Sequence, residues 1–151
     1  MGYSGFEWVW LFFAFSFFGW ILETATAAVR RRRFVNRGLV NGPLCVIYGI
    51  TGTAVMVFCR ELQGIWLFLG SMIFSTLAEW IAGHVIEKMY HERWWDYSNM
   101  KWNLDGYICL PVSVVWGVLG MLTMRWGAPL LIRVYRMIPR VPGHLLIWIL
   151  T

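Results

Sequence analysis

The chain has 151 residues, of which 59% are hydrophobic and only 14% are charged. A soluble domain carries about a quarter charged residues, so this composition excludes an ordinary soluble protein and predicts an integral membrane protein, because lipid can solvate such a surface and water cannot. We assign the net charge of +5 to membrane topology and anionic headgroups, and not to nucleic acid, since no nucleic-acid-binding module is visible.

Four segments of the chain are apolar enough to suggest membrane-spanning helices. A helix needs about 20 apolar residues to cross a hydrocarbon core about 30 Å thick. The first segment is preceded by no basic region and followed by no small-residue cleavage site, so we interpret it as a retained helix and not as a signal peptide. The predicted spans are residues 5–29, 43–59, 65–88 and 106–124, of which the second is short.

The C-terminal part of the sequence has a different pattern. Residues 126–138 combine apolar side chains with Arg133 and Arg136 at helical spacing, which predicts an amphipathic helix on the membrane surface. The apolar tail, residues 141–151, is too short to span and is compatible with the start of a fifth helix in a truncated chain. The expected fold is therefore all-α. It is a polytopic transmembrane bundle with four spanning helices, a surface helix and a candidate partial fifth helix, in one membrane domain covering residues 1–151.

The lysines and arginines predict how the chain is oriented. Loops on the cytoplasmic side of a membrane are enriched in these residues, which here follow the first and third spans: Arg30–Arg33, Arg37, Lys88, Arg93 and Lys101. We therefore expect a plasma-membrane protein with its N-terminus outside, although the arginines between Arg125 and Arg140 argue in part against this orientation. The run Arg30–Arg33 is interpreted as an orientation signal and, alternatively, as a lipid-binding patch.

With this topology, polar side chains gather at the cytoplasmic end of the spans. Carboxylates inside membrane helices are costly and usually face a partner or a cavity. Glu79 is the hardest to explain otherwise, because seventeen uncharged residues precede it and seven follow it. Gly83, between Glu79 and Glu87 on one helix face, would let another group approach closely. The candidate substrate-binding residues are Glu23, Asn36, Arg37, Glu79, Glu87, Asp96, Tyr97, Ser98 and Asn103.

Two interpretations of these residues compete. In the functional interpretation, they line a pocket at the cytoplasmic face that binds a polar or cationic group. In the structural interpretation, Glu23 and Glu79 pair with Arg37 or with loop amides and hold short helices together.

Several chemistries receive little support from the sequence. His84, Glu87 and His91 have a spacing that can serve a metal ion, but a polar helix end near headgroups explains the same residues, and we predict no metal and no other cofactor. The sequence contains no Walker A, HExxH or GxSxG motif, which argues against ATP hydrolysis through a P-loop. The three cysteines are interpreted as buried core residues.

The ordered motifs resemble a known family. The motifs are Phe18-Gly19-Trp20 with Glu23, then FVNRGLVNGPLCVIYG over residues 34–49, then Glu79 and Glu87, then RWWDYS and NLDGYICL, which ends at Leu110. Together they resemble the bacterial membrane family called putative ABC-transporter type IV, or CmpB-like, over about residues 12–120. Beyond the candidate residues above, the matched positions are Gly38, Gly42, Pro43, Tyr48, Gly49, Trp95 and Gly106. The chain departs from the pattern at Val46, where the family often has proline, and His84 is not part of it.

The resemblance implies a permease-like membrane component. We therefore expect a transporter-like protein that works in the lipid bilayer as a homo-oligomer or with a membrane or ATPase subunit, and that handles a small polar solute or a lipid headgroup. The alternative is a membrane enzyme acting on a lipid headgroup or polyprenyl phosphate, with Glu79 or Asp96 as general base and Arg37 with Asn36 holding phosphate. A structural or assembly subunit without its own activity is the third possibility. Between transport and enzymatic activity, we expect transport.

Overall fold

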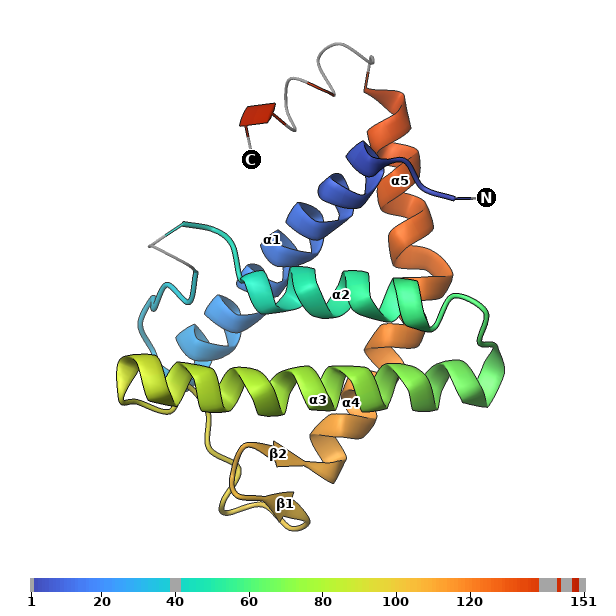
Figure 1. Ribbon diagram of the computed structural model, residues 1–151. Helices are drawn as coiled ribbons and strands as arrows, with labels where there is room; N and C mark the ends of the chain where they lie inside the picture. Colours follow the sequence, from blue (N-terminus) through green and yellow to red (C-terminus); the bar gives the residue numbers. More distant parts are fainter. Residues whose placement is uncertain (1, 39–41, 139–143, 145–147, 150–151) are drawn as a thin grey trace. The chain divides into compact units, whose positions relative to one another are not determined.

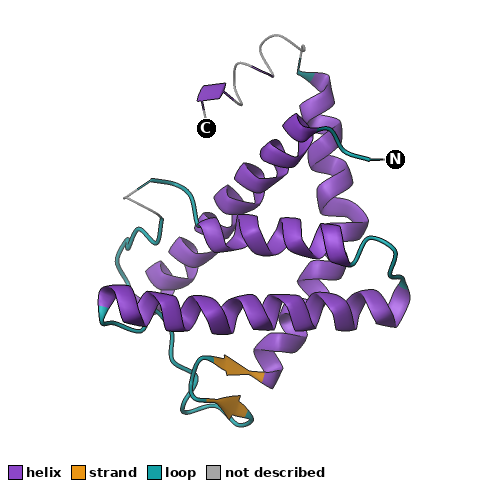
Figure 2. Ribbon diagram, in the orientation of Figure 1, coloured by secondary structure: helices purple, strands orange, loops and turns teal. Residues whose placement is uncertain are grey.

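The computed structural model describes residues 2–38, 42–138, 144 and 148–149, and these residues are mostly helical (Figures 1 and 2). The elements in chain order are α1 (Gly5–Arg31), α2 (Val46–Phe58), α3 (Gly64–Tyr90), β1 (Asn103–Leu104), β2 (Ile108–Cys109), α4 (Leu110–Leu122), a π-helical turn (Thr123–Gly127) and α5 (Ala128–Met137). The prediction of a helical membrane protein is confirmed. Among the described residues, the β1–β2 sheet is the one element of regular secondary structure that is not helical, and it was not predicted from the sequence.

Among the described residues, three helical stretches are long and apolar enough to cross a membrane, rather than the four expected. They are Gly5–Arg31, Gly64–Tyr90 and Leu110–Met137, with 27, 27 and 28 residues. The predicted second span, residues 43–59, contains the 13-residue helix α2, which is about 20 Å long at 1.5 Å per residue and so is shorter than a hydrocarbon core. The residue before this helix, Cys45, donates its backbone N–H to the Ser16 carbonyl of α1.

The predicted boundary between the fourth span and a surface helix falls at a π-helical turn, and the surface position of the second helix stays a prediction. Residues 110–137 form one continuous helical stretch, in which the π-helical turn Thr123–Gly127 joins α4 to α5. Pro129 is the second residue after this turn and lies in the first turn of α5, where its missing N–H costs little. The helix therefore continues where the sequence suggested a break. The predicted apolar tail, residues 141–151, lies largely outside the described residues.

The chain divides into two compact units. Unit 1 comprises residues 1–53 and 125–151, and unit 2 comprises residues 54–124. The prediction of one membrane domain over residues 1–151 stays a prediction.

Unit 1 is built on α1. A capping box starts this helix, because the Ser4 hydroxyl accepts from the Glu7 backbone and the Glu7 carboxylate accepts from the Ser4 backbone. Two contacts hold α5 against α1: the Trp10 indole donates to the Leu131 carbonyl at 2.9 Å, and Arg136 pairs with Glu7 at 2.6 Å. The amphipathic character predicted for this segment therefore serves a helix contact, with Ile132 on the buried side.

Unit 2 contains α3 and α4, which pack against each other. The buried residues of α3 recur every four positions, at Ser71, Ser75, Glu79 and Gly83, and those of α4 are Ser113 and Gly117. Small residues at helix contacts let two membrane helices approach closely. Residues 93–109, which we call the polar hairpin, connect the two helices, and the β1–β2 register within it pairs Asn103 with Cys109 and Leu104 with Ile108.

Candidate functional site

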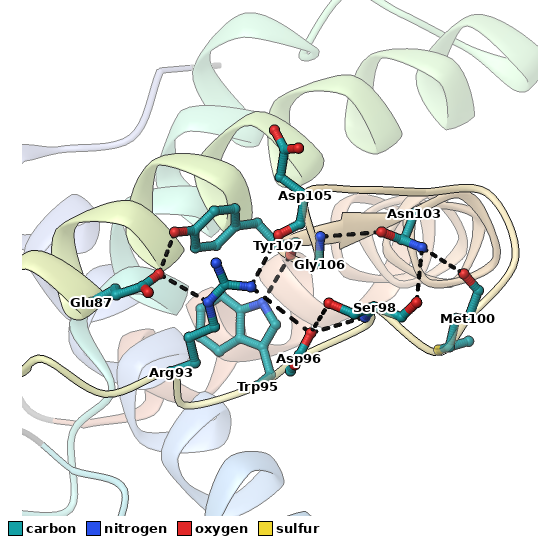
Figure 3. Close-up of polar contacts among 10 residues, drawn as sticks. All are labelled: Glu87, Arg93, Trp95, Asp96, Ser98, Met100, Asn103, Asp105, Gly106 and Tyr107. Atoms are coloured by element: carbon teal, nitrogen blue, oxygen red, sulfur yellow. Dashed lines mark hydrogen bonds and ion pairs between the residues drawn. The ribbon is translucent and has the colours of Figure 1, made fainter.

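The polar hairpin is fastened to the C-terminal end of α3 through Glu87 (Figure 3). Glu87 Oε2 accepts one hydrogen bond from Arg93 Nε at 3.0 Å and another from the Tyr107 hydroxyl. The Tyr107 ring stacks on His84, with centroids 3.9 Å apart, and the Arg93 guanidinium carbon lies 4.4 Å from its centroid. A carboxylate, a guanidinium and two rings therefore form one contact between helix and hairpin.

Gly83 makes room for this contact. A Cβ at this position would lie 2.6 Å from Tyr107 Cδ1 and 3.4 Å from Trp95 Cζ2, and the first distance is well inside van der Waals contact. The Trp95 indole also donates to the Tyr107 carbonyl at 2.8 Å. The sequence analysis predicted a close approach at Gly83, and the group that approaches is the hairpin's own Tyr107.

Asp96 organises the first half of the hairpin. Its Oδ1 accepts from the Ser98 backbone at 2.9 Å and from the Ser98 hydroxyl at 2.5 Å, and it lies 3.9 Å from Arg93 Nη1. An aspartate that bonds the backbone two residues ahead stabilises a turn. The same Arg93 nitrogen donates to the Asp105 carbonyl at 3.1 Å, which ties the two ends of the hairpin together.

Asn103 organises the second half. Its amide nitrogen donates to the carbonyls of Met100 at 2.7 Å and Ser98 at 3.3 Å, and its Oδ1 accepts from the Gly106 backbone at 3.2 Å. Gly106 has φ +74, and a Cβ there would lie 2.5 Å from Ser98 Oγ. Both the left-handed backbone and the lack of space require glycine at this position.

The charges around Arg93 shift three ionisation equilibria. The hydrogen bonds from Ser98, assisted by Arg93, hold the pKa of Asp96 below its ordinary value. The hydrogen bond to Glu87, with partial burial, raises the pKa of Tyr107. Partial burial opposes the charge of Arg93, but Glu87 outweighs this effect and raises its pKa. The hairpin therefore holds a charged Asp96, a charged Arg93 and a neutral Tyr107 near neutral pH.

Glu79 lies two turns before Glu87 on α3. Glu79 is buried, with only 7% of its surface exposed. Its Oε1 accepts a hydrogen bond from the Tyr97 hydroxyl at 3.0 Å. The backbone N–H of Tyr97 donates to the Gly106 carbonyl at 2.8 Å, so the hairpin fold positions the hydroxyl. Six predicted site residues are thus linked within unit 2: Glu79, Glu87, Asp96, Tyr97, Ser98 and Asn103.

The other three predicted site residues lie in unit 1, along the C-terminal half of α1. Glu23 accepts from the Tyr48 hydroxyl at 2.6 Å. Asn36 Oδ1 accepts from the Trp20 indole at 2.6 Å and from the Gly38 backbone at 2.9 Å, and the Arg37 backbone donates to Thr24 at 3.4 Å. The prediction that all nine residues line one pocket stays a prediction.

The sequence analysis did not assign Arg93, Tyr107 and Tyr48 to the site. Arg93 entered through topology and as the first residue of RWWDYS, Tyr107 as a member of NLDGYICL, and Tyr48 as a position matched to the family. A basic residue six positions after Glu87 was a usable signal for Arg93, because it can pair with a carboxylate near the helix end when the chain folds back.

The spacing of His84, Glu87 and His91 does not produce a metal site here. His84 Nδ1 faces the Trp80 carbonyl at 2.9 Å, and its ring stacks on Tyr107. In the part of the chain that the structure describes, no group of three His, Cys, Asp or Glu side chains is arranged to hold a metal ion. The prediction that the protein needs no metal or other cofactor stays a prediction.

The comparison with protein families agrees with the membrane helices and the motifs of both units. A family model with the description "Putative ABC-transporter type IV" matches residues 10–151. The chain belongs to this family. The membership confirms the resemblance drawn from the motifs and extends it to the C-terminus, and the three long apolar helices agree with a family of membrane proteins. No curated protein and no solved structure is significantly similar to the chain.

Proposed function

We propose that this ABC-transporter type IV chain is a membrane-embedded, permease-like transport subunit of the plasma membrane. Glu79 and the polar hairpin form the part of it that contacts a small polar or cationic solute at the cytoplasmic face. The family description and the three long apolar helices support transport in a membrane. The three candidate spanning helices of the described residues are few for a transporter, so we expect the chain to work as a homo-oligomer or with an ATPase subunit.

The observation that carries the proposal is the position of Glu79. It is a carboxylate that is 7% exposed, on a helix long and apolar enough to span a membrane. Such groups are costly in a membrane and tend to mark solute or ion pathways. The Tyr97 hydroxyl donates a hydrogen bond to Glu79 and so connects it to the polar hairpin. A solute that replaces this hydroxyl at Glu79 would therefore contact the carboxylate and release the hairpin from it.

Charge removal at Glu79 tests this function. The full chain is reconstituted in liposomes, alone and with a co-expressed ATPase subunit, and the retention of labelled potassium, choline and polyamines is measured against protein-free liposomes. We expect faster release of one of these cations, and about a tenfold slower release with Glu79→Gln, since a loss of about 1.4 kcal/mol of binding corresponds to that factor. Glu61→Gln is the matched control, because Glu61 is exposed and its described partner is the neighbouring Arg60.

A structural role is the second candidate, and the hairpin contacts favour it. The hydrogen bonds of Asp96, Ser98 and Asn103 described above all go to the hairpin itself. If Glu79 also serves only to hold the fold, Glu79→Gln lowers the amount or thermal stability of the protein in the membrane and changes no flux. Unchanged retention of all tested cations by a folded, unaltered protein would therefore replace the transport function with this one.

A further inference from the structure

Four consecutive arginines, Arg30–Arg33, end α1 and begin the loop after it. All four are exposed. Among the described residues, none of the four forms an ion pair, whereas Arg60, Arg93 and Arg136 each pair with a carboxylate. The charge of this cluster is therefore not neutralised within the described part of the chain.

The backbone turns at this cluster. Arg32 has φ +51 and ends α1 in the left-handed conformation. The loop then runs back along the same helix, where Asn36 accepts from Trp20 and the Arg37 backbone donates to Thr24. The four arginines consequently lie at the tip of α1, with the apolar side chains of Val29 and Phe34 exposed by 81% and 71% on either side.

The length of α1 sets the depth of this tip. Its 27 residues are about 40 Å long, about 10 Å more than the hydrocarbon thickness. The last turn therefore reaches the phosphate layer when the apolar part of the helix is centred in the bilayer. Exposed apolar side chains next to arginines are well placed at this depth. The apolar side chains can enter the boundary of the acyl chains, and the guanidinium groups can form bidentate hydrogen bonds with lipid phosphates.

We propose that Arg30–Arg33, together with Phe34, form a binding site for the headgroup of anionic phospholipid in the leaflet that meets the C-terminal end of α1. The proposal goes beyond orientation of the chain and is independent of the transport function. A basic residue at an anionic surface contributes about a fivefold gain in association, which corresponds to ~1 kcal/mol.

The test uses the full chain in micelles of a neutral detergent, where topology in the membrane plays no part. Spin-labelled phosphatidylglycerol and phosphatidylcholine are added separately, and the protein-bound fraction of each is measured by electron paramagnetic resonance. The expected result is at least a fivefold preference for phosphatidylglycerol, which falls as the salt concentration rises to about 1 M, where screening acts over about 3 Å. The absence of a preference, or a preference insensitive to salt, would overturn the proposal.

Matched variants locate the preference. Arg31→Gln with Arg33→Gln should reduce it at least fivefold, whereas Arg125→Gln with Arg133→Gln removes the same charge elsewhere and should leave it intact. Arg31→Lys with Arg33→Lys should keep it within about twofold, because the charge is retained, and this separates loss of the site from misfolding. An equal loss in both glutamine variants contradicts the proposal. Displacement of the lipid by inorganic phosphate at constant ionic strength would assign the cluster to free phosphate and contradict it too.

Discussion

Tyr107 is the side chain on which the polar hairpin converges. Its hydroxyl donates to Glu87, its ring contacts His84 and Arg93, and its carbonyl accepts from Trp95. One residue thus joins a carboxylate of α3, a guanidinium and the hairpin backbone. Its removal should affect the attachment of the hairpin more than any single change to Asp96 or Asn103, whose bonds stay inside the hairpin.

The ionisation of Tyr107 should report this attachment. Because Glu87 accepts its hydrogen bond, the pKa of Tyr107 is raised above the ordinary value of 10.0. A raised pKa means that the stabilisation is fully present below about pH 10 and is lost as the pH rises through the higher folded-state pKa. Tyrosinate absorbance is measured as a function of pH for the unaltered protein and for Tyr107→Phe. The difference between the two titration curves gives the ionisation of Tyr107. Titration at or below the ordinary value would contradict the prediction, and Glu87→Gln should lower the pKa.

The cysteines give a second prediction at the residue scale. Cys45, Cys59 and Cys109 are free and buried, and burial, with the nearby Glu23 carboxylate, raises the pKa of the Cys45 thiol to about 12. The thiolate is the reactive form, so alkylation of the folded protein near neutral pH should be at least tenfold slower than after denaturation at all three sites. Mass spectrometry of the alkylated chain measures this. Rapid labelling of folded Cys45 would show that the loop along α1 is open.

At the scale of elements, the contact between α3 and the polar hairpin depends on the absence of a side chain at Gly83. Gly83→Val forces the added carbons against Tyr107, and overpacking of this kind costs about 1–3 kcal/mol. The hairpin should open more often, and trypsin should cleave after the exposed Lys101 about tenfold faster. Leu77→Val, at a half-exposed position on α3, adds the same β-branched residue without this clash. Equal cleavage rates in the two variants would disprove the role of Gly83.

The contact between α1 and α5 rests on a different interaction. Glu7 belongs to the capping box of α1 and also pairs with Arg136 of α5. Since the Arg136 side chain is 57% exposed, solvent screens the pair, and a double-mutant cycle with Glu7→Gln and Arg136→Gln should give a coupling of roughly 1 kcal/mol. Thermal unfolding of the four proteins in detergent measures it. Additive effects would mean that Glu7 acts only as a cap.

At the scale of the whole molecule, orientation is the property that the charges predict. Five arginines lie at or just after the C-terminal end of α1, and the N-terminal end carries Glu7. We expect the N-terminus outside, so Gly2→Cys should react in intact cells with a membrane-impermeant maleimide, whereas Phe34→Cys should react only after permeabilisation. The native cysteines are buried and give a low background. The reverse labelling pattern would invert the orientation.

The membrane class, two of the long helices and the family could be predicted from the sequence. Apolar runs of sufficient length indicate α1 and α3 because the hydrocarbon core sets a minimum length, and this requirement is local to each run. The motifs indicated the family because they are ordered along the chain. Glu87, Asp96 and Asn103 could be predicted to be part of a polar region, because each lies at or just beyond the end of a predicted helix.

Tertiary contacts decided the rest. The predicted second span contains only the helix over residues 46–58, whose preceding residue Cys45 is bonded to α1, and the segment after residue 124 stays helical through a π-helical turn. The partners of Glu87 are Arg93 and Tyr107, which the hairpin brings back over the end of α3. Local composition determines whether a segment prefers lipid or water. The partners that hydrogen-bond or pair with the polar side chains of a segment can lie far away in the sequence, as Glu7 and Arg136 do at a separation of 129 positions. Only the folded chain brings such residues together.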